Sequence, residues 1–235
     1  MISERKFASS YTSFWNHLLP RVDGYLRRVN CSCERYSDET PVLASTHRDR
    51  RGIVNELAFR LFQATCAKGN LSGVDVRGIA EEVRQYVERL SKANDAVVKE
   101  PVAQAEITEA TALCASLQMY FEGIPFAELV FWPQFAGCGI LDAVKGDIIH
   151  DRCLYEVKAG DRSFRVTDIR QVLIYCAMDF AADRFGVKHV VLLNPRRGTH
   201  FRTSVEDMVR ETAGCSAVEF CGNIVEFLSS ENTSR

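Results

Sequence analysis

The chain has 235 residues, enough for one sizeable hydrophobic core or for a core with a helical extension. Hydrophobic residues make up 46% and charged residues 26%, which is ordinary for a soluble globular protein, and no window approaches the roughly 18 apolar residues of a membrane span. The net charge of −2 requires any nucleic-acid surface to come from local basic patches rather than from bulk charge. Because residues 1–6 also lack the apolar run of a signal peptide, we expect a cytoplasmic protein with no membrane partner.

The first half of the chain predicts helices. Residues 8–29 carry apolar side chains at helix-like intervals, whereas residues 30–47 are polar and irregular, as in a loop. Further helices are predicted over residues 50–67, 76–93 and 106–122. We therefore expect a helical N-terminal region over residues 1–104 and an α/β domain over residues 105–235.

The pattern changes to short β-prone runs from about residue 127. Three strands are predicted over residues 127–134, 140–149 and 153–158. Thr167 is expected to cap a helix that runs to about residue 185 and is ended by Gly186. The later predicted elements are a strand over 188–193 and a helix over 204–213, with residues 216–229 left ambiguous and the polar tail after them expected to fray. The order helix, three antiparallel strands, helix, strand predicts an α/β fold.

One face of the predicted hairpin gathers two carboxylates and an ammonium group. A hairpin loop at residues 150–153 places Asp147 opposite Glu156, and residues opposite one another point to the same face. Lys158 shares that face because it follows Glu156 by two residues in the strand. Such a group is costly in a partly buried sheet unless something binds there. Mg²⁺ or Mn²⁺ would suit it, since a hard cation takes one or two carboxylates, and Lys158 would orient an attacking water or offset charge on the phosphorane.

This arrangement resembles the PD-(D/E)XK nuclease superfamily, in which an acidic residue on one strand is followed by an acidic residue, any residue and lysine on the next. Asp147 would fill the first place, and Glu156-Val157-Lys158 the second. Gln171 and Tyr175 lie on one helical face and resemble the Gln-x-x-x-Tyr motif of the RecB-like branch. The resemblance covers about residues 106–195 and implies a restriction-endonuclease-like core. It also implies that Asp147 and Glu156 bind metal and that Gln171 and Tyr175 position the substrate and the lysine.

Two positions of the family pattern stay open. Asp142 also fits the first acid, but a regular strand puts it on the face opposite to Asp147 unless Gly146 makes a bulge. The short loop that its register needs favours Asp147. Many family members also place a glutamate on the helix before the sheet, and Glu56 and Glu109 are both candidates for that place.

The resemblance implies a Mg²⁺- or Mn²⁺-dependent nuclease that acts on DNA, with RNA as the less favoured alternative, and restriction, repair or anti-phage defence is its context by analogy. A phosphate-binding rim is expected from Arg162, Arg165 and Arg170, together with Arg196 and Arg197. One alternative is an inactive nuclease-fold module that binds nucleic acid or a partner protein. Another is a structural helical protein whose α/β half assembles a complex. A homodimer would suit double-strand cutting.

Other chemistry-bearing residues have structural interpretations. Glu156 and Lys158 alone could be an ordinary cross-strand charge pair. Phe131 and Trp132 are expected to be core or strand residues rather than base-stacking platforms. Among the nine cysteines, the pairs Cys31 with Cys33 and Cys215 with Cys221 could together hold zinc or an iron–sulfur cluster, but neither pair has the usual two-residue spacing, which argues against it.

Overall fold

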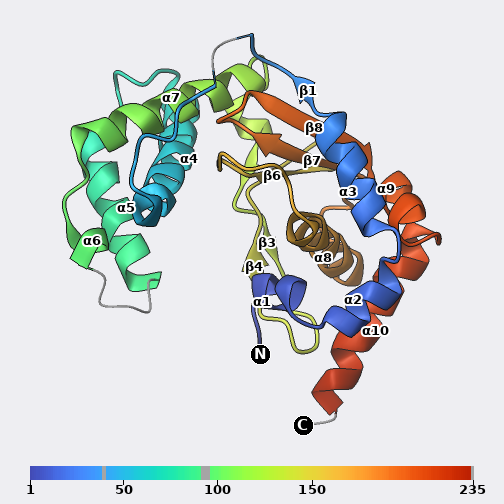
Figure 1. The fold of residues 1–235 in the computed structure, drawn as a ribbon. Helices are drawn as coiled ribbons and strands as arrows, with labels where there is room; N and C mark the ends of the chain where they lie inside the picture. Colours follow the sequence, from blue (N-terminus) through green and yellow to red (C-terminus); the bar gives the residue numbers. More distant parts are fainter. Residues whose placement is uncertain (39–40, 91–95, 234–235) are drawn as a thin grey trace.

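The computed structural model describes residues 1–38, 41–90 and 96–233, and it has an α/β fold (Figure 1). Its helices are α1 (Glu4–Ser9), α2 (Thr12–Leu18), α3 (Val22–Cys31), α4 (Arg51–Lys68), α5 (Val76–Leu90), α6 (Ala96–Lys99), α7 (Gln104–Tyr120), α8 (Val166–Ala182), α9 (Val205–Thr212) and α10 (Ala217–Thr233). Its strands are β1 (Glu34–Arg35), β2 (Val130–Phe131), β3 (Gln134–Phe135), β4 (Val144–Lys145), β5 (Ile148–His150), β6 (Cys153–Val157), β7 (His189–Asn194) and β8 (Thr199–Ser204). None of the helices in the described ranges is both long and apolar enough to cross a membrane.

Six strands form one mixed sheet in the order β1-β8-β7-β6-β5-β2, and β3 pairs with β4 in a separate small sheet. The β5–β6 hairpin pairs Ile149 with Leu154, which confirms the register expected from the sequence. Its turn residues Asp151 and Arg152 both have positive φ, as a tight hairpin turn requires. Helix α8 then returns the chain so that β7 pairs parallel with β6. The predicted α/β class is therefore confirmed, but the strands predicted over residues 127–134 and 140–149 are each divided in two, into β2 and β3 and into β4 and β5.

Helices cover both faces of the large sheet and build two cores (Figure 1). On one face α1–α3 pack with α8, α9 and α10, and on the other α4 packs with α5 and α7. Successive residues of β6 alternate between the cores, because Leu154 belongs to the first and Tyr155 to the second. The first core joins Phe7 to Ile169, and the second joins Leu57 to residues of β7. Both cores thus combine residues from either side of residue 104, so packing does not separate the two regions that the sequence suggested.

The prediction of a single helix over residues 8–29 is wrong. The segment is divided among α1, α2 and α3. Tyr11 takes a left-handed conformation (φ 47°) between α1 and α2. Pro20 lies between α2 and α3, and it has no backbone N–H with which to continue a helix.

Several other boundaries differ from the predicted ones. The N-cap of α8 is Arg165 rather than Thr167, and the helix ends at Ala182 with Asp183 as its C-cap (φ 47°), before Gly186 is reached. The ambiguous residues 216–229 form part of α10. Strands β1 and β8 were not expected, since their short runs are mostly polar. Residues 91–93 of the predicted third helix, 39–40 of the predicted loop and 234–235 of the tail lie outside the described residues.

Candidate functional site

Asp147, Glu156 and Lys158 meet at the end of the β5–β6 hairpin. Asp147 directly precedes β5, and its Oδ2 accepts a 2.7 Å hydrogen bond from the backbone N–H of Val157 across the hairpin. Lys158 follows the last residue of β6, and its Nζ lies 2.7 Å from Oε1 of Glu156. The antiparallel register therefore brings together the three side chains that the sequence grouped on one face.

The two carboxylates are poorly compensated. Glu156 is 3% exposed, and its Oε2 is buried without a hydrogen-bond partner in the described part of the chain. Burial, and next the negative charge of Glu156, raise the pKa of the Asp147 carboxyl well above its usual range, although the Val157 N–H and the charge of Lys158 act against that shift. A buried acceptor and a nearby second carboxylate are the environment in which a cation is most strongly favoured.

Lys158 is held as a charged ammonium by acidic and amide oxygens. Besides Glu156, its Nζ lies 2.6 Å from Oε1 of Gln171 and 3.7 Å from Oδ1 of Asp168. Burial alone would lower the pKa of Lys158, but the negative charges of Glu156 and Asp168 outweigh it and raise the pKa. The side chain is therefore suited to donate hydrogen bonds and to stabilise negative charge rather than to accept a proton.

Gln171 and Tyr175 on α8 form the support behind Lys158. The Gln171 Nε2 donates to the Tyr175 hydroxyl at 2.8 Å, while its Oε1 accepts from the lysine. Tyr175 is 2% exposed and stacks on Phe135, and burial raises the pKa of its hydroxyl, which therefore stays protonated. Gln171 lines the cavity described below, whereas Tyr175 contacts it only through Gln171.

The hairpin face opens into a cavity of about 790 Å³. Its floor includes Asp147, Glu156 and Lys158, and Arg162, Asp168 and Gln171 contribute from the α8 side. Three helices from the N-terminal half complete the wall: α1 with Arg5, Ala8 and Ser9, α4 with Gly52, Asn55, Glu56 and Phe59, and α5 with Tyr86, Val87 and Leu90. The site is thus built by segments from both halves of the chain, and its volume falls in the range of small-ligand pockets.

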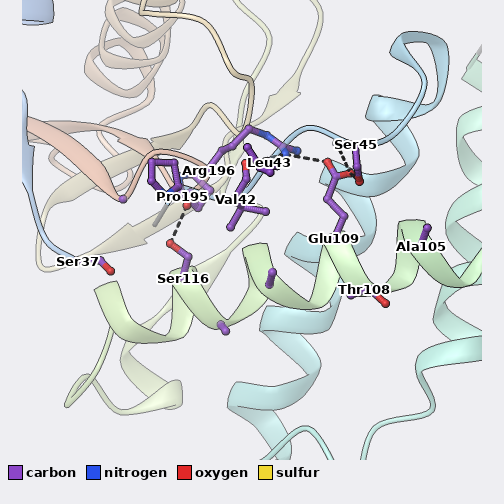
Figure 2. Close-up of a pocket in the computed structure, with 14 residues that line it drawn as sticks. Ser37, Val42, Leu43, Ser45, Ala105, Thr108, Glu109, Ser116, Pro195 and Arg196 are labelled. Carbon is purple, nitrogen blue, oxygen red and sulfur yellow. Dashed lines mark hydrogen bonds and ion pairs between the residues drawn. The ribbon is translucent and has the colours of Figure 1, made fainter. Parts of the chain in front are cut away.

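The structure separates the two candidate upstream glutamates. Glu56 lines the cavity and forms an ion pair with Arg60 at 2.8 Å. Glu109 points instead into a second pocket of about 700 Å³ between α7 and the segment before α4, where Figure 2 shows it directed at Ser45 and Arg196. Its Oε1 lies 2.8 Å from Arg196, and its Oε2 accepts hydrogen bonds from Ser45 and Thr46. Glu109 therefore has a structural role, and Glu56 is the glutamate that faces the candidate site.

The two candidate first acids are separated in the same way. Asp142 lies in the connection between β3 and β4, where its backbone N–H donates to the carbonyl of Ile2. It does not line the cavity, whereas Asp147 does. The geometry therefore favours Asp147, the residue preferred on hairpin register.

Only part of the predicted arginine rim lies at the cavity. Arg162 lines it and forms a two-pronged ion pair with Asp168 at 2.7 and 3.1 Å. Burial would raise the pKa of Asp168, but the hydrogen bonds from Arg162 and the charge of Lys158 lower it. Arg165 is exposed outside the cavity lining, at the N-cap of α8.

Two arginines of the predicted rim are structural, which corrects that expectation. Arg170 is 9% exposed, donates to the carbonyl of Ala8 at 3.0 Å and lies over the ring of Trp15, so it fastens α1 and α2 to α8. Arg196 is 3% exposed and is enclosed by its ion pair with Glu109, while Arg197 is exposed. Helical periodicity and charge cannot distinguish such buried arginines from a solvent-facing rim.

The donor set fits a hard divalent cation. Two carboxylates with one buried, unpartnered oxygen match the way in which Mg²⁺ binds one or two carboxylates and keeps several waters. Among the described residues no group of three or more His, Cys, Asp and Glu side chains is arranged to hold a metal. All nine cysteines are free thiols, and none is gathered into the cluster considered from the sequence.

Three residues near the site were not assigned to it from the sequence. Glu4 on α1 is 8% exposed, and its Oε1 lies 3.4 Å from Nε2 of Gln171. Arg5 beside it and Trp132 before β3 line the cavity itself, although Trp132 was expected to be a core or strand residue. Their distance in sequence from the hairpin hides this proximity, and no local motif could have identified them.

No family model, no curated protein and no solved structure matches this chain.

Proposed function

We propose that this protein is a metal-dependent nuclease that hydrolyses phosphodiester bonds, with DNA as its substrate. The observation that carries the proposal is the buried oxygen of Glu156, which has no partner among the described residues and lies beside Asp147 and the ammonium of Lys158. A cation is the partner that best compensates two adjacent carboxylates, and a lysine on the same floor suits a phosphate ligand.

The arrangement around the site supports a restriction-endonuclease-like core. Helix α7, the antiparallel strands β2, β5 and β6, helix α8 and the parallel strand β7 follow one another in the order that the resemblance to PD-(D/E)XK nucleases implies. The Gln171–Tyr175 pair also contacts Lys158 from α8, as the Gln-x-x-x-Tyr resemblance implies.

Asp147 and Glu156 would hold Mg²⁺ or Mn²⁺. When bound there, the cation supplies Lewis-acid stabilisation of negative charge on a phosphate oxygen. The raised pKa of Asp147 disfavours its ionised form when no cation is bound, and a bound cation would lower that pKa because it offsets both burial and the charge of Glu156.

The protein residues supply orientation and charge during hydrolysis. Water forms a bond to phosphorus as one ester P–O bond breaks in line with it; the water loses a proton to solvent, and the leaving oxygen takes one up. Lys158, kept protonated by Glu156 and Asp168, donates to the reacting phosphate or the attacking water. Gln171 fixes the lysine amine in position, and Tyr175 fixes Gln171.

The test is cleavage of labelled single-stranded DNA, double-stranded DNA and RNA with Mg²⁺ or Mn²⁺. We expect Glu156→Gln to abolish metal-dependent cleavage and Lys158→Ala to reduce it by about 10²–10³-fold, the usual effect of removing a preorganised donor to a developing oxyanion. Lys145→Ala is the matched control, because Lys145 is exposed on β4 and does not line the cavity.

Circular dichroism of every variant separates loss of chemistry from loss of fold. Lys158→Ala leaves buried acidic oxygens without their cation and therefore also lowers stability. Cleavage that persists in folded Glu156→Gln and Lys158→Ala proteins would show that the hairpin is not the active site. Absence of cleavage by the wild type with either metal and all three substrates would contradict the nuclease proposal and favour a binding module.

A further inference from the structure

Aromatic side chains form one wall of the cavity. Phe59 from α4, Tyr86 from α5 and Trp132 from the turn after β2 all line it. Phe59 is 7% exposed and packs edge-on against Trp132 at 5.6 Å between ring centroids. Tyr86 is 36% exposed, and the guanidinium of Arg60 lies 4.9 Å from its ring centroid. Phe59 thus supports the wall from behind, while Tyr86 and Trp132 carry its accessible ring surface.

The backbone of Trp132 is unusual and is tied directly to the candidate metal site. Its φ is 48°, a left-handed conformation that a bulky residue rarely adopts and that glycine would adopt freely. Its N–H donates to the backbone carbonyl of Asp147 at 2.9 Å. Strained backbone that persists beside a site is a reason to look for a role of the side chain it presents.

The indole of Trp132 differs from that of the only other tryptophan. Trp15 is fully buried, and its Nε1 donates to the carbonyl of Phe7 at 2.8 Å. Trp132 is half-buried, and its indole N–H has no hydrogen-bond partner among the described residues. A fully buried tryptophan such as Trp15 normally satisfies its N–H within the protein, whereas half-buried Trp132 retains ring surface and a donor that a ligand can reach.

Three cations also line the cavity. Arg5 on α1 has a side chain that is 81% exposed, and its guanidinium lies 3.6 Å from Glu4. Arg162, ion-paired with Asp168, lines the same cavity, and Lys158 lies on its floor. Aromatic rings and cations that line one groove are the combination with which proteins bind single-stranded nucleic acid, since bases stack on the rings and phosphates contact the cations.

We propose that the substrate is single-stranded nucleic acid, in the first place DNA, and that one unstacked base packs on Trp132 next to the scissile phosphate. This inference rests on the proposed nuclease function and specifies its substrate class. In a duplex the base faces are covered by neighbouring pairs, so a base reaches an aromatic wall only after it is unstacked and extruded. A cavity of about 790 Å³ accepts an unstacked nucleotide.

The test measures binding without cleavage, in protein freed of metal with a chelator. The chain has two tryptophans, and Trp15 is fully buried, so a change in tryptophan fluorescence on adding oligothymidylate reports on Trp132. We expect clear quenching by the single strand and little by a blunt duplex of equal length. Trp132→Phe should remove the quenching while leaving the emission of Trp15.

Fluorescence anisotropy with a labelled oligonucleotide measures the affinity itself. Trp132→Ala should weaken single-strand binding by about tenfold or more, the usual effect of losing one stacking contact. Trp132→Gly is the second variant, because glycine relieves the left-handed backbone and protects against simple unfolding. Phe126→Ala is the matched control, since Phe126 is 40% exposed, packs on Phe131 and lies outside the cavity lining.

The outcomes distinguish this inference from the proposed function. Quenching by the single strand together with loss of affinity in both Trp132 variants supports the stacking site, even if no cleavage is ever detected. Equal or tighter binding of the duplex, or unchanged affinity in folded Trp132→Ala and Trp132→Gly proteins, overturns it, even if the protein cleaves DNA through Lys158. An RNA oligonucleotide that quenches as DNA does supports the single-strand class and extends it.

Discussion

We expect Asp147 and Glu156 to destabilise the protein when no cation is bound, because the two carboxylates repel each other in a partly buried position. Each carboxylate lies in a partly or fully buried position, and the one ammonium nearby is shared with Gln171 and Asp168. Groups arranged for a ligand are commonly unfavourable without it, so a substitution that removes a charge here should stabilise the fold while it removes function.

We predict that Asp147→Asn stabilises the metal-free protein by about 1 kcal/mol, because the amide oxygen still accepts from the Val157 N–H and the repulsion with Glu156 is gone. For a chain of this length that corresponds to a rise of about 3 °C in Tm. Under the proposed metal-dependent function, Mg²⁺ or Mn²⁺ should raise the Tm of the wild type by mass action, and this variant should lose that shift. A lower Tm for metal-free Asp147→Asn than for the wild type would contradict the repulsion.

The pH dependence of this stabilisation has a definite sign. A carboxyl whose pKa is raised by folding contributes its full stability below the unfolded value of about 4 and loses it as pH rises through the folded value. The difference in Tm between metal-free Asp147→Asn and wild type should therefore be near zero at about pH 4 and grow toward neutral and alkaline pH. Thermal melts of both proteins across this pH range measure the difference in Tm. A difference that shrinks with rising pH would show that the ionised Asp147 carboxylate does not destabilise the fold.

Helices α1 and α8 act together on the lysine. The carboxamide oxygen of Gln171 accepts from Lys158, and its nitrogen donates to Tyr175 and Glu4. The partners of the nitrogen therefore determine which way the amide faces. Arg170, one residue earlier, fastens α1 to α8 through the carbonyl of Ala8. The docking of one short N-terminal helix thus contributes to the orientation of the site.

The connection between β3 and β4 docks on the end of α10 through Gly139. This glycine has a φ of 54°, and a Cβ there would collide with the backbone carbonyl of Leu228. We predict that Gly139→Ala destabilises the protein by at least about 2 kcal/mol, from the left-handed backbone and the displaced helix end.

Gly222 in the same helix provides the contrast. A Cβ at Gly222 meets nothing within 4 Å. Gly222→Ala should therefore stabilise α10 by about 0.5–1 kcal/mol. Chemical denaturation of both variants measures the two changes, and a Gly139→Ala protein as stable as the wild type would refute the close docking.

The whole molecule unfolds as one unit if its two cores are as interdependent as their residues imply. α1–α3 complete the core on one face of the sheet, and α4 and α5 complete the core on the other. We predict a single cooperative thermal transition for the full chain, and no cooperative folding for a fragment of residues 105–235, because both faces of its sheet would lose apolar cover.

Calorimetry and the dispersion of amide signals in NMR spectra test whether the fragment folds, with the full chain prepared in parallel for comparison. Two separate transitions in the full chain, or a well-dispersed fragment spectrum, would restore the independent domain that residues 105–235 suggested. Addition of a 1–104 fragment is a further control, since shared cores predict that the two pieces fold only together.

Much of the fold and the centre of the site were predictable from local pattern. A short loop at residues 150–153 predicted the hairpin register, and that register placed Asp147, Glu156 and Lys158 on one face. The four-residue spacing of Gln171 and Tyr175 likewise predicted the pair that contacts Lys158 from α8. The helix break at Pro20 could have been predicted from local chemistry and was missed.

By itself, the sequence determined which side chains share a face, because strand and helix geometry relate neighbours within a few residues. Only the tertiary structure decided which distant segments close the cavity. It brought Glu4 to Gln171 and Arg5 and Trp132 to the cavity, placed Glu56 rather than Glu109 there, and buried Arg170 under α1. These outcomes depend on how whole helices pack across the sheet, and packing is set by the summed burial of many apolar side chains rather than by any local spacing.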